Sequence, residues 1–194
     1  MSKGRLEAFS DGVIAILITI MVLEFRVPRG DDWASLGAMA PQLLSYVLSF
    51  VFLGIYWNNH HHMLHLAGGM NGAILWANLH LLFWLSLVPA ATGWMGQNWR
   101  AVAPTAVYGG ILLAAAVAYL ILQGAIVAEQ GSDSRLRAAI GNDAKGKLSA
   151  LLYAFAILAS FRRPWIADLA YVVVATMWLV PDKRIESVTR PDGS

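Results

Sequence analysis

Cysteine is absent from this 194-residue sequence, and charged residues are scarce. Without cysteine, the chain cannot form disulfides or thiolate metal sites. Lys, Arg, Asp and Glu together make up 13% of the residues, and an ordinary soluble domain carries about 25%. The formal net charge of +2 gives no support to a nucleic-acid partner. A chain so poor in charge does not suit a water-exposed surface, so the composition argues against a soluble protein.

Apolar residues take the place of the missing charge and amount to 58% of the chain, with eight Trp and six Tyr among them. Aromatic rings of this kind collect at membrane interfaces. Six apolar stretches each approach the ~20 residues that a helix needs to cross the hydrocarbon core of a bilayer. We therefore predict an all-α membrane protein with a single domain, 1–194, of six transmembrane helices. The approximate spans are 6–25, 39–57, 73–95 with a kink at Pro89, 107–127, 148–160 and 165–180.

The distribution of basic residues predicts how the six spans are oriented, because cytoplasmic loops are enriched in Lys and Arg. An even number of spans places both termini on one side. With that side inside the cell, nine basic residues are cytoplasmic, namely Lys3, Arg5, Arg135, Arg137, Lys145, Lys147, Lys183, Arg184 and Arg190. Five are then external, namely Arg26, Arg29, Arg100, Arg162 and Arg163. We expect cytoplasmic termini.

The first span carries polar residues that need an explanation: Arg5, Ser10, Asp11 and Thr19. A carboxylate at this position is either solvated in the interfacial layer or bonded to a partner on another helix. Direct contact between Asp11 and Arg5 is strained, because six residues of helix rise by ~9 Å. The candidate partners on other helices are Asn58, Asn59, His60, His61, His62, Trp76 and His80.

A second set of side chains on the first span forms an apolar stripe. At 100° per residue, one group falls within about 60° of a single line: Ile16, Thr19, Ile20 and Leu23. Asp11 lies about 140° away from Ile16 on the same wheel. The two faces therefore have different roles. Spacing alone is equally consistent with a packing surface, a lipid-facing surface or a pore lining.

Two other classes of function stay open from the residues. His61 and His65 are four apart, as metal or haem ligands on a helix often are, so a membrane metalloprotein is conceivable. The alternative is that these histidines only form hydrogen bonds near Asp11, or respond to pH. A proton-coupled transporter using Asp11 or the histidines is a further hypothesis, although the two halves of the chain do not repeat. The sequence lacks the motifs of hydrolases and phosphate-binding loops, so we predict that it is not an enzyme.

A resemblance to a known family gives the stripe a function. The run Arg5-Leu6-Glu7-Ala8-Phe9-Ser10-Asp11 matches the Arg-x-x-x-Phe-Ser-Asp signature of the transmembrane protein 175 family, which comprises endosomal and lysosomal potassium channels and their prokaryotic relatives. The following residues, 12–24, resemble the rest of that family's first helix. The run Tyr56-Trp57-Asn58-Asn59-His60-His61-His62 resembles the end of its second helix.

This resemblance implies a potassium-preferring cation channel that conducts passively, without a cofactor, as a homotetramer in a prokaryotic inner membrane. The pore would be lined by the first helices, with a hydrophobic constriction at Ile16 and further pore-facing residues at Thr19, Ile20 and Leu23. The signature residues Arg5, Phe9, Ser10 and Asp11 would fix the first helix to its neighbours. The polar partners proposed for them are Asn58, His61, Trp76 and His80.

The sequence holds no Thr-Val-Gly-Tyr-Gly loop, whose carbonyl groups replace the hydration shell of potassium in other channels. Selection at a ring of Ile16 would depend on partial dehydration, which costs less for potassium than for sodium. We therefore expect a modest preference for potassium.

Overall fold

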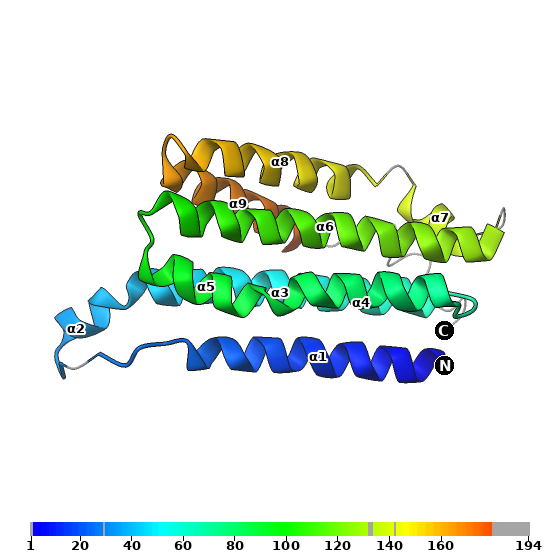
Figure 1. Cartoon of the computed structure of the whole chain (residues 1–194), viewed down its shortest axis with the longest axis horizontal. Coiled ribbons are helices and arrows are strands. Elements are labelled where there is room, and N and C mark those ends of the chain that lie inside the picture. Colours follow the sequence, from blue (N-terminus) through cyan, green and yellow to red (C-terminus); the bar gives the residue numbers. More distant parts are fainter. Residues whose placement is uncertain (1, 29, 132–133, 142, 180–194) are drawn as a thin grey trace, which may run out of the picture.

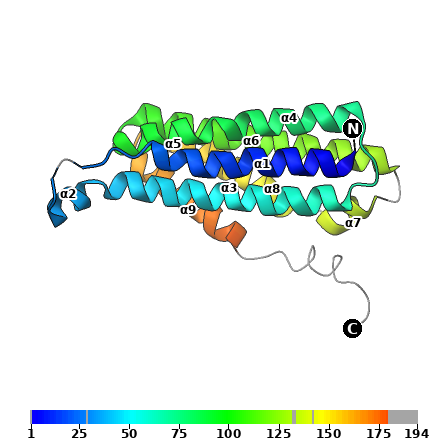
Figure 2. The same ribbon diagram turned by 90° about the horizontal axis from the view of Figure 1, so that it is seen from below.

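The computed structural model describes residues 2–28, 30–131, 134–141 and 143–179. These residues form helices joined by turns (Figure 1). The helices are α1 (Lys3–Leu23), α2 (Trp33–Ala38), α3 (Ala40–Leu66), α4 (Gly72–Ser86), α5 (Val88–Gln97), α6 (Val102–Gln130), α7 (Arg135–Ile140), α8 (Ala144–Ser160) and α9 (Pro164–Leu179). The long helices run along a common direction (Figures 1 and 2). The prediction of an all-helical chain is confirmed for the described residues.

Local sequence explains several helix ends. The Asp32 carboxylate accepts a hydrogen bond from the backbone N–H of Ser35 at 2.8 Å and so begins α2. Hydrogen bonding to the Ser35 side chain, and then to its backbone N–H, lowers the pKa of the Asp32 carboxyl group. The Asn71 side chain begins α4 in the same way, accepting from the Ile74 N–H at 2.9 Å. Pro89 lies in the first turn of α5, where its missing N–H is tolerated, and the helical run breaks at Leu87. The predicted span 73–95 is thus divided into α4 and α5.

Among the described residues, four helical segments are long and apolar enough to cross a membrane: Lys3–Leu23, Ala40–Leu66, Gly72–Gln97 and Val102–Gln130. The predicted fifth and sixth spans fall on α8 and α9, which have 17 and 16 residues. The end of the sixth predicted span, Val180, lies outside the described residues, as do Arg29, Lys183, Arg184 and Arg190.

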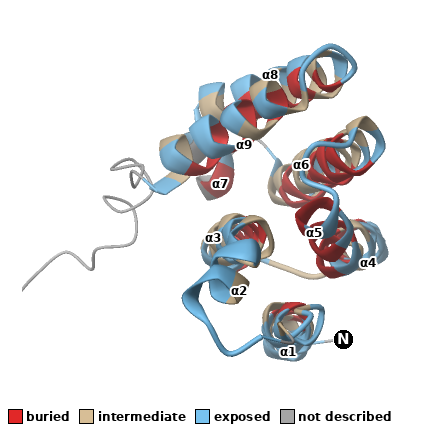
Figure 3. Ribbon diagram, turned by 90° about the vertical axis from the view of Figure 1, so that its left-hand side faces the viewer, coloured by how far each residue is buried: buried red, intermediate tan, exposed pale blue. Residues whose placement is uncertain are grey.

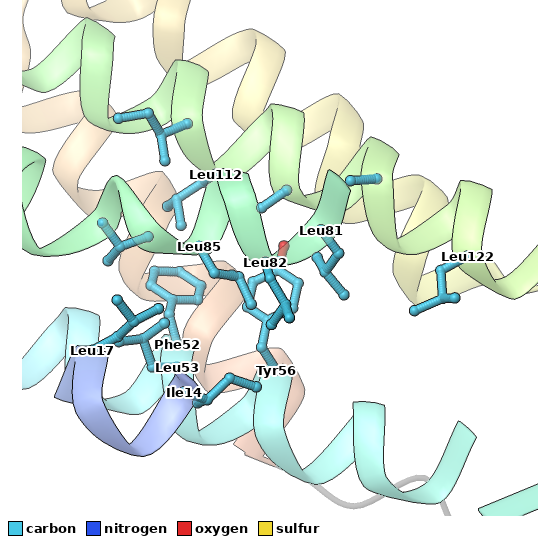
Figure 4. Packing of buried hydrophobic residues seen from close by; sticks show 14 of the residues in the cluster. Ile14, Leu17, Phe52, Leu53, Tyr56, Leu81, Leu82, Leu85, Leu112 and Leu122 are labelled. Atoms are coloured by element: carbon cyan, nitrogen blue, oxygen red, sulfur yellow. The ribbon is translucent and has the colours of Figure 1, made fainter. Parts of the chain in front are cut away.

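The core lies where α3, α4, α5, α6, α8 and α9 meet, with one face of α1 added at its edge. Figure 4 shows Phe52, Leu53 and Tyr56 of α3 packed in this core with Ile14 and Leu17 of α1. On the opposite side, Tyr171 of α9 is fully buried and donates a hydrogen bond to the Thr105 carbonyl at 2.9 Å. A side chain added at Gly109 would collide with the Tyr171 hydroxyl. Glycine at position 109 therefore makes room for this tyrosine.

The N-terminal end of α1 is held near the ends of α3 and α6. The Lys3 ammonium donates to the carbonyls of His65 at 2.7 Å and Ala67 at 3.2 Å, which are left without helical partners where α3 ends. The Gln130 side-chain amide donates to the Leu66 carbonyl at 2.6 Å. The end of α3 is therefore bonded to the beginning of α1 and to the end of α6.

Candidate pore helix and its polar contacts

Helix α1 lies at one edge of the bundle, between α3 on one side and α4 on the other (Figure 3). Its buried side chains recur every three or four residues and form one face: Leu6, Ser10, Ile14, Leu17 and Met21. Helical periodicity thus directs one stripe of the helix into the chain and leaves the opposite stripe exposed.

The stripe predicted to line a pore lies on that opposite face. Ile16 is 56% exposed, Ile20 39% and Leu23 80%, and Thr19 is exposed beside them. The Thr19 hydroxyl donates to the Ile16 carbonyl at 2.9 Å, so its proton is already engaged while its oxygen lone pairs stay available. The stripe is therefore accessible to lipid, to another subunit or to an ion.

A buried hydrogen-bond cluster joins α1, α3 and α4. Ser10, His60 and Asn78 are each at most 1% exposed. The Asn78 amide donates through Nδ2 to the Ser10 hydroxyl at 3.0 Å, and its Oδ1 lies 2.7 Å from His60 Nε2. Because an amide oxygen only accepts, His60 carries its proton on Nε2 and donates it. Asn78 is therefore the centre of the cluster, with one bond to α1 and one to α3.

Asp11 is held by a separate contact on the more open side of α1. The indole Nε1 of Trp57 donates to Asp11 Oδ1 at 3.0 Å. Asp11 thus has a partner on another helix. Trp57 was not among the candidates from the sequence.

The other two signature residues point the other way. Arg5 is exposed and Phe9 is 49% exposed. Both line a shallow groove between α1 and α4, together with Leu6, Leu75 and Leu79. Among the described residues, no hydrogen bond or ion pair reaches the Arg5 guanidinium. Within one chain, then, Ser10 and Asp11 bond to neighbouring helices while Arg5 and Phe9 face outward.

The polar partners predicted from the sequence lie elsewhere. Asn58 is exposed and Trp76 is 74% exposed. His80 accepts a hydrogen bond from Trp84 Nε1 of its own helix at 2.9 Å. His61 stacks between Trp57 and His65 on the outer side of α3, with ring centroids 6.3 Å apart in both pairs. In the described part of the chain, no group of three or more His, Asp or Glu residues is placed to hold a metal ion.

Comparison with known proteins identifies the family. The sequence model of the family described as endosomal/lysosomal potassium channel TMEM175 matches residues 5–89. The chain is 54% identical to a protein named as a potassium channel from Chryseobacterium sp. (strain P1-3), over 96% of this chain and 97% of that one. The chain belongs to the TMEM175 family.

Other TMEM175 relatives agree with this assignment. A protein named as a potassium channel from Streptomyces collinus is 37% identical over 62% of each chain. The crystal structure of a lysosomal potassium-selective channel TMEM175 homolog from Chamaesiphon minutus matches with a TM-score of 0.82 and 29% identity, covering 92% of this chain and 96% of that one. The resemblance inferred from the signature is confirmed, and the fold is that of a TMEM175 channel.

The region matched by the TMEM175 family model contains both the polar cluster and the separate contact between Asp11 and Trp57. Ser10, Asp11, Trp57, His60 and Asn78 all fall within residues 5–89. The bonds that join α1 to α3 and α4 through Ser10 and Asp11 therefore lie in the part of the chain that the family model matches, whereas Lys3, which bonds to the end of α3, lies outside it.

Proposed function

We propose that four copies of this chain form a passive, potassium-preferring cation channel whose pore is lined by α1. The observation that carries the proposal is the outward face of α1, where Ile16, Ile20 and Leu23 are exposed although the helix is bonded to its own chain on the other face. The relatives named as potassium channels support the choice of ion. Because the two faces are separate, α1 can be bonded to its own subunit on one face and line a pore with the other.

In this proposal the subunit crosses the membrane six times, with α4 and α5 together as the third span and α8 and α9 as the last two. At 1.5 Å per residue, α8 and α9 are about 25 Å long, slightly less than the ~30 Å of an average hydrocarbon core. Local thinning of the bilayer accommodates such a mismatch at modest cost. The larger number of basic residues on the side that holds both termini supports a cytoplasmic location for them, and the bacterial relatives support a prokaryotic inner membrane.

A ring of subunits around α1 gives Arg5 and Phe9 a role. In Figure 3, α1 lies at the lower edge of the bundle, with α3 above it to the left and α4 above it to the right. A closed ring around α1 then brings the α4 side of one subunit against the α3 side of the next. The groove that holds Arg5 and Phe9 lies on the α4 side. We place these two residues at the contact between subunits, where they complete the anchoring of α1 that Ser10 and Asp11 begin within the chain.

Selectivity in this channel arises at a ring of Ile16 side chains, which forms a narrow, poorly wetted neck. An ion that passes the neck loses part of its hydration shell, and potassium loses water at lower cost than sodium. The Thr19 oxygen, whose proton is engaged by the Ile16 carbonyl, offers a lone pair to the ion one turn further on. The metal or haem alternative and the transporter alternative are not favoured.

The test is a flux assay on purified protein in liposomes, driven by a potassium gradient and repeated with sodium. The wild type should pass potassium faster than sodium. Ile16→Asn should reduce that ratio, because an amide ring hydrates the neck and removes the dehydration cost. The matched control is Ile121→Asn on α6, where Ile121 is 47% exposed and outside the proposed pore. An unchanged ratio in Ile16→Asn would exclude Ile16 as the constriction.

The oligomeric state is measured on the same preparations in detergent. We expect a mass of four chains for the wild type. Phe9→Ala should shift the mass toward smaller species, whereas Phe155→Ala should not, because Phe155 is 54% exposed on α8 and far from the proposed contact. A wild-type monomer that conducts no ions would refute the channel.

A further inference from the structure

A pocket separate from the α1 site lies between α3, α6, α8 and α9 and has a volume of about 40 Å³. Its walls are apolar and aromatic, with tyrosine side chains from three different helices at Tyr56, Tyr119 and Tyr153. The indole of Trp178 lines it from α9. None of the lining residues in the described part of the chain is charged. The pocket therefore suits a guest with an apolar body.

Some polar groups of the pocket are already bonded within the protein. Trp178 Nε1 donates to the Ser149 hydroxyl at 2.8 Å, and Ser149 donates to the Lys145 carbonyl at 2.8 Å. The Tyr119 hydroxyl lies 3.4 Å from the Asn59 carbonyl, to which it donates a long hydrogen bond. These bonds fix the walls of the pocket, and they leave Ser149 and Trp178 with no donor to offer a guest.

Three other polar groups of the pocket have no such bond. Tyr56 is 9% exposed and Tyr153 is 3% exposed, yet among the described residues no hydrogen bond involves either hydroxyl or the side-chain amide of Asn59. These three groups line the pocket, so each is available to bond to a guest. A guest that offers one hydrogen-bonding group can therefore be held at one end while its apolar body contacts the aromatic walls.

Charge and size narrow the class of guest. An ion is disfavoured, because removing a charge from water is costly and no lining side chain compensates it. One water molecule needs about 10–15 Å³, so the pocket holds a molecule of only a few heavy atoms. We propose that the pocket is a binding site for a small neutral alcohol, whose apolar body lies against the aromatic walls and whose hydroxyl bonds to Tyr56, Tyr153 or Asn59.

Trichloroethanol is a suitable probe, because it is a compact neutral alcohol and quenches tryptophan fluorescence on contact. We expect its titration into the full chain in detergent to show a saturable quenching component, which is lost in Trp178→Phe. Ala116→Leu fills the pocket with side-chain atoms and should weaken that component at least tenfold. Ala114→Leu is the matched control, because residue 114 lies on the opposite side of α6 and does not line the pocket. Tyr153→Phe should weaken it about 2- to 10-fold, the effect of one hydrogen bond.

Two results would overturn the proposal. Quenching that rises linearly with concentration, and equally in wild type and Ala116→Leu, would mean that the alcohol only partitions into the micelle and that water alone fills the pocket. Saturable quenching that persists in both Trp178→Phe and Ala116→Leu would place the alcohol at another site. A thermal unfolding scan of each variant confirms that it is folded. No step of this test depends on ion conduction.

Discussion

The two faces of α1 differ in what holds them. On the inner face, the Ser10 hydroxyl accepts a hydrogen bond from Asn78, and apolar packing of Leu17 and Met21 holds the second half of the helix. On the more open side, the Asp11 carboxylate accepts a hydrogen bond from Trp57. On the outer face, the apolar side chains of Ile16, Ile20 and Leu23 are exposed. The difference shows that the attachment of α1 within the subunit is complete without the outer stripe, so substitutions there test function while those on the inner face test stability.

The largest difference in stability between the two faces is expected when leucine is replaced by alanine on each of them. Leu17 is 7% exposed and Leu23 is 80% exposed. Leu17→Ala leaves a cavity and should lower the free energy of unfolding by about 2 kcal/mol. This value is at the low end for a core leucine, because lipid solvates the leucine side chain once the helices have separated. Leu23→Ala should change the free energy of unfolding by less than about 0.5 kcal/mol. Thermal unfolding midpoints in detergent measure both, and equal shifts would contradict the assignment of the faces.

A smaller loss of stability is expected from a substitution of Asn78, the centre of the polar cluster. Asn78→Leu removes the partner of both Ser10 and His60 and leaves two buried polar groups unpaired, which should cost about 1–2 kcal/mol. The control is Asn98→Leu, because the Asn98 amide bonds only to the Trp94 carbonyl at the exposed end of α5. If both variants unfold at the wild-type temperature, the cluster does not anchor α1.

The smallest loss of stability is expected when the hydrogen bond between Trp57 and Asp11 is removed. Trp57→Phe keeps an aromatic ring but removes the donor to Asp11, and this bond lies where water competes for it. We expect a loss of about 0.5 kcal/mol. Trp84→Phe, which removes a bond to His80 within a single helix, serves as the comparison. A loss above that of Asn78→Leu would make Asp11 rather than Ser10 the principal anchor.

The sequence was sufficient for the division of α1 into two faces. Helical geometry alone placed Asp11 and the stripe at Ile16 on different sides, and the structure exposes Ile16 and bonds Asp11 to another helix. The family could also be predicted from the sequence, because the Arg-x-x-x-Phe-Ser-Asp run is specific to it. These features are local to one helix, where spacing along the chain fixes relative direction.

Most of the bonding partners could not be predicted: His60 was among the candidates, but for Asp11 and not for the cluster that contains Ser10. Asn78 lies in an otherwise apolar run of α4, and its importance depends on Ser10 and His60 reaching it from two other helices. The one available signal was a lone amide in a predicted membrane span, where a buried polar group needs partners. Trp57 was missed because its indole N–H was not weighed as a donor to Asp11. The short helix α2 also escaped notice, because its residues 33–38 follow a polar turn and belong to no apolar span.

The close approach of Tyr171 to Gly109 has a consequence for how this subunit can vary. The hydroxyl of a fully buried tyrosine fills the space where any side chain at position 109 would begin. In a library with every amino acid at position 109, selection for folded protein should return glycine almost alone. Alanine should recover only when position 171 mutates with it, so the two sites would evolve as a pair although 62 positions separate them in the sequence.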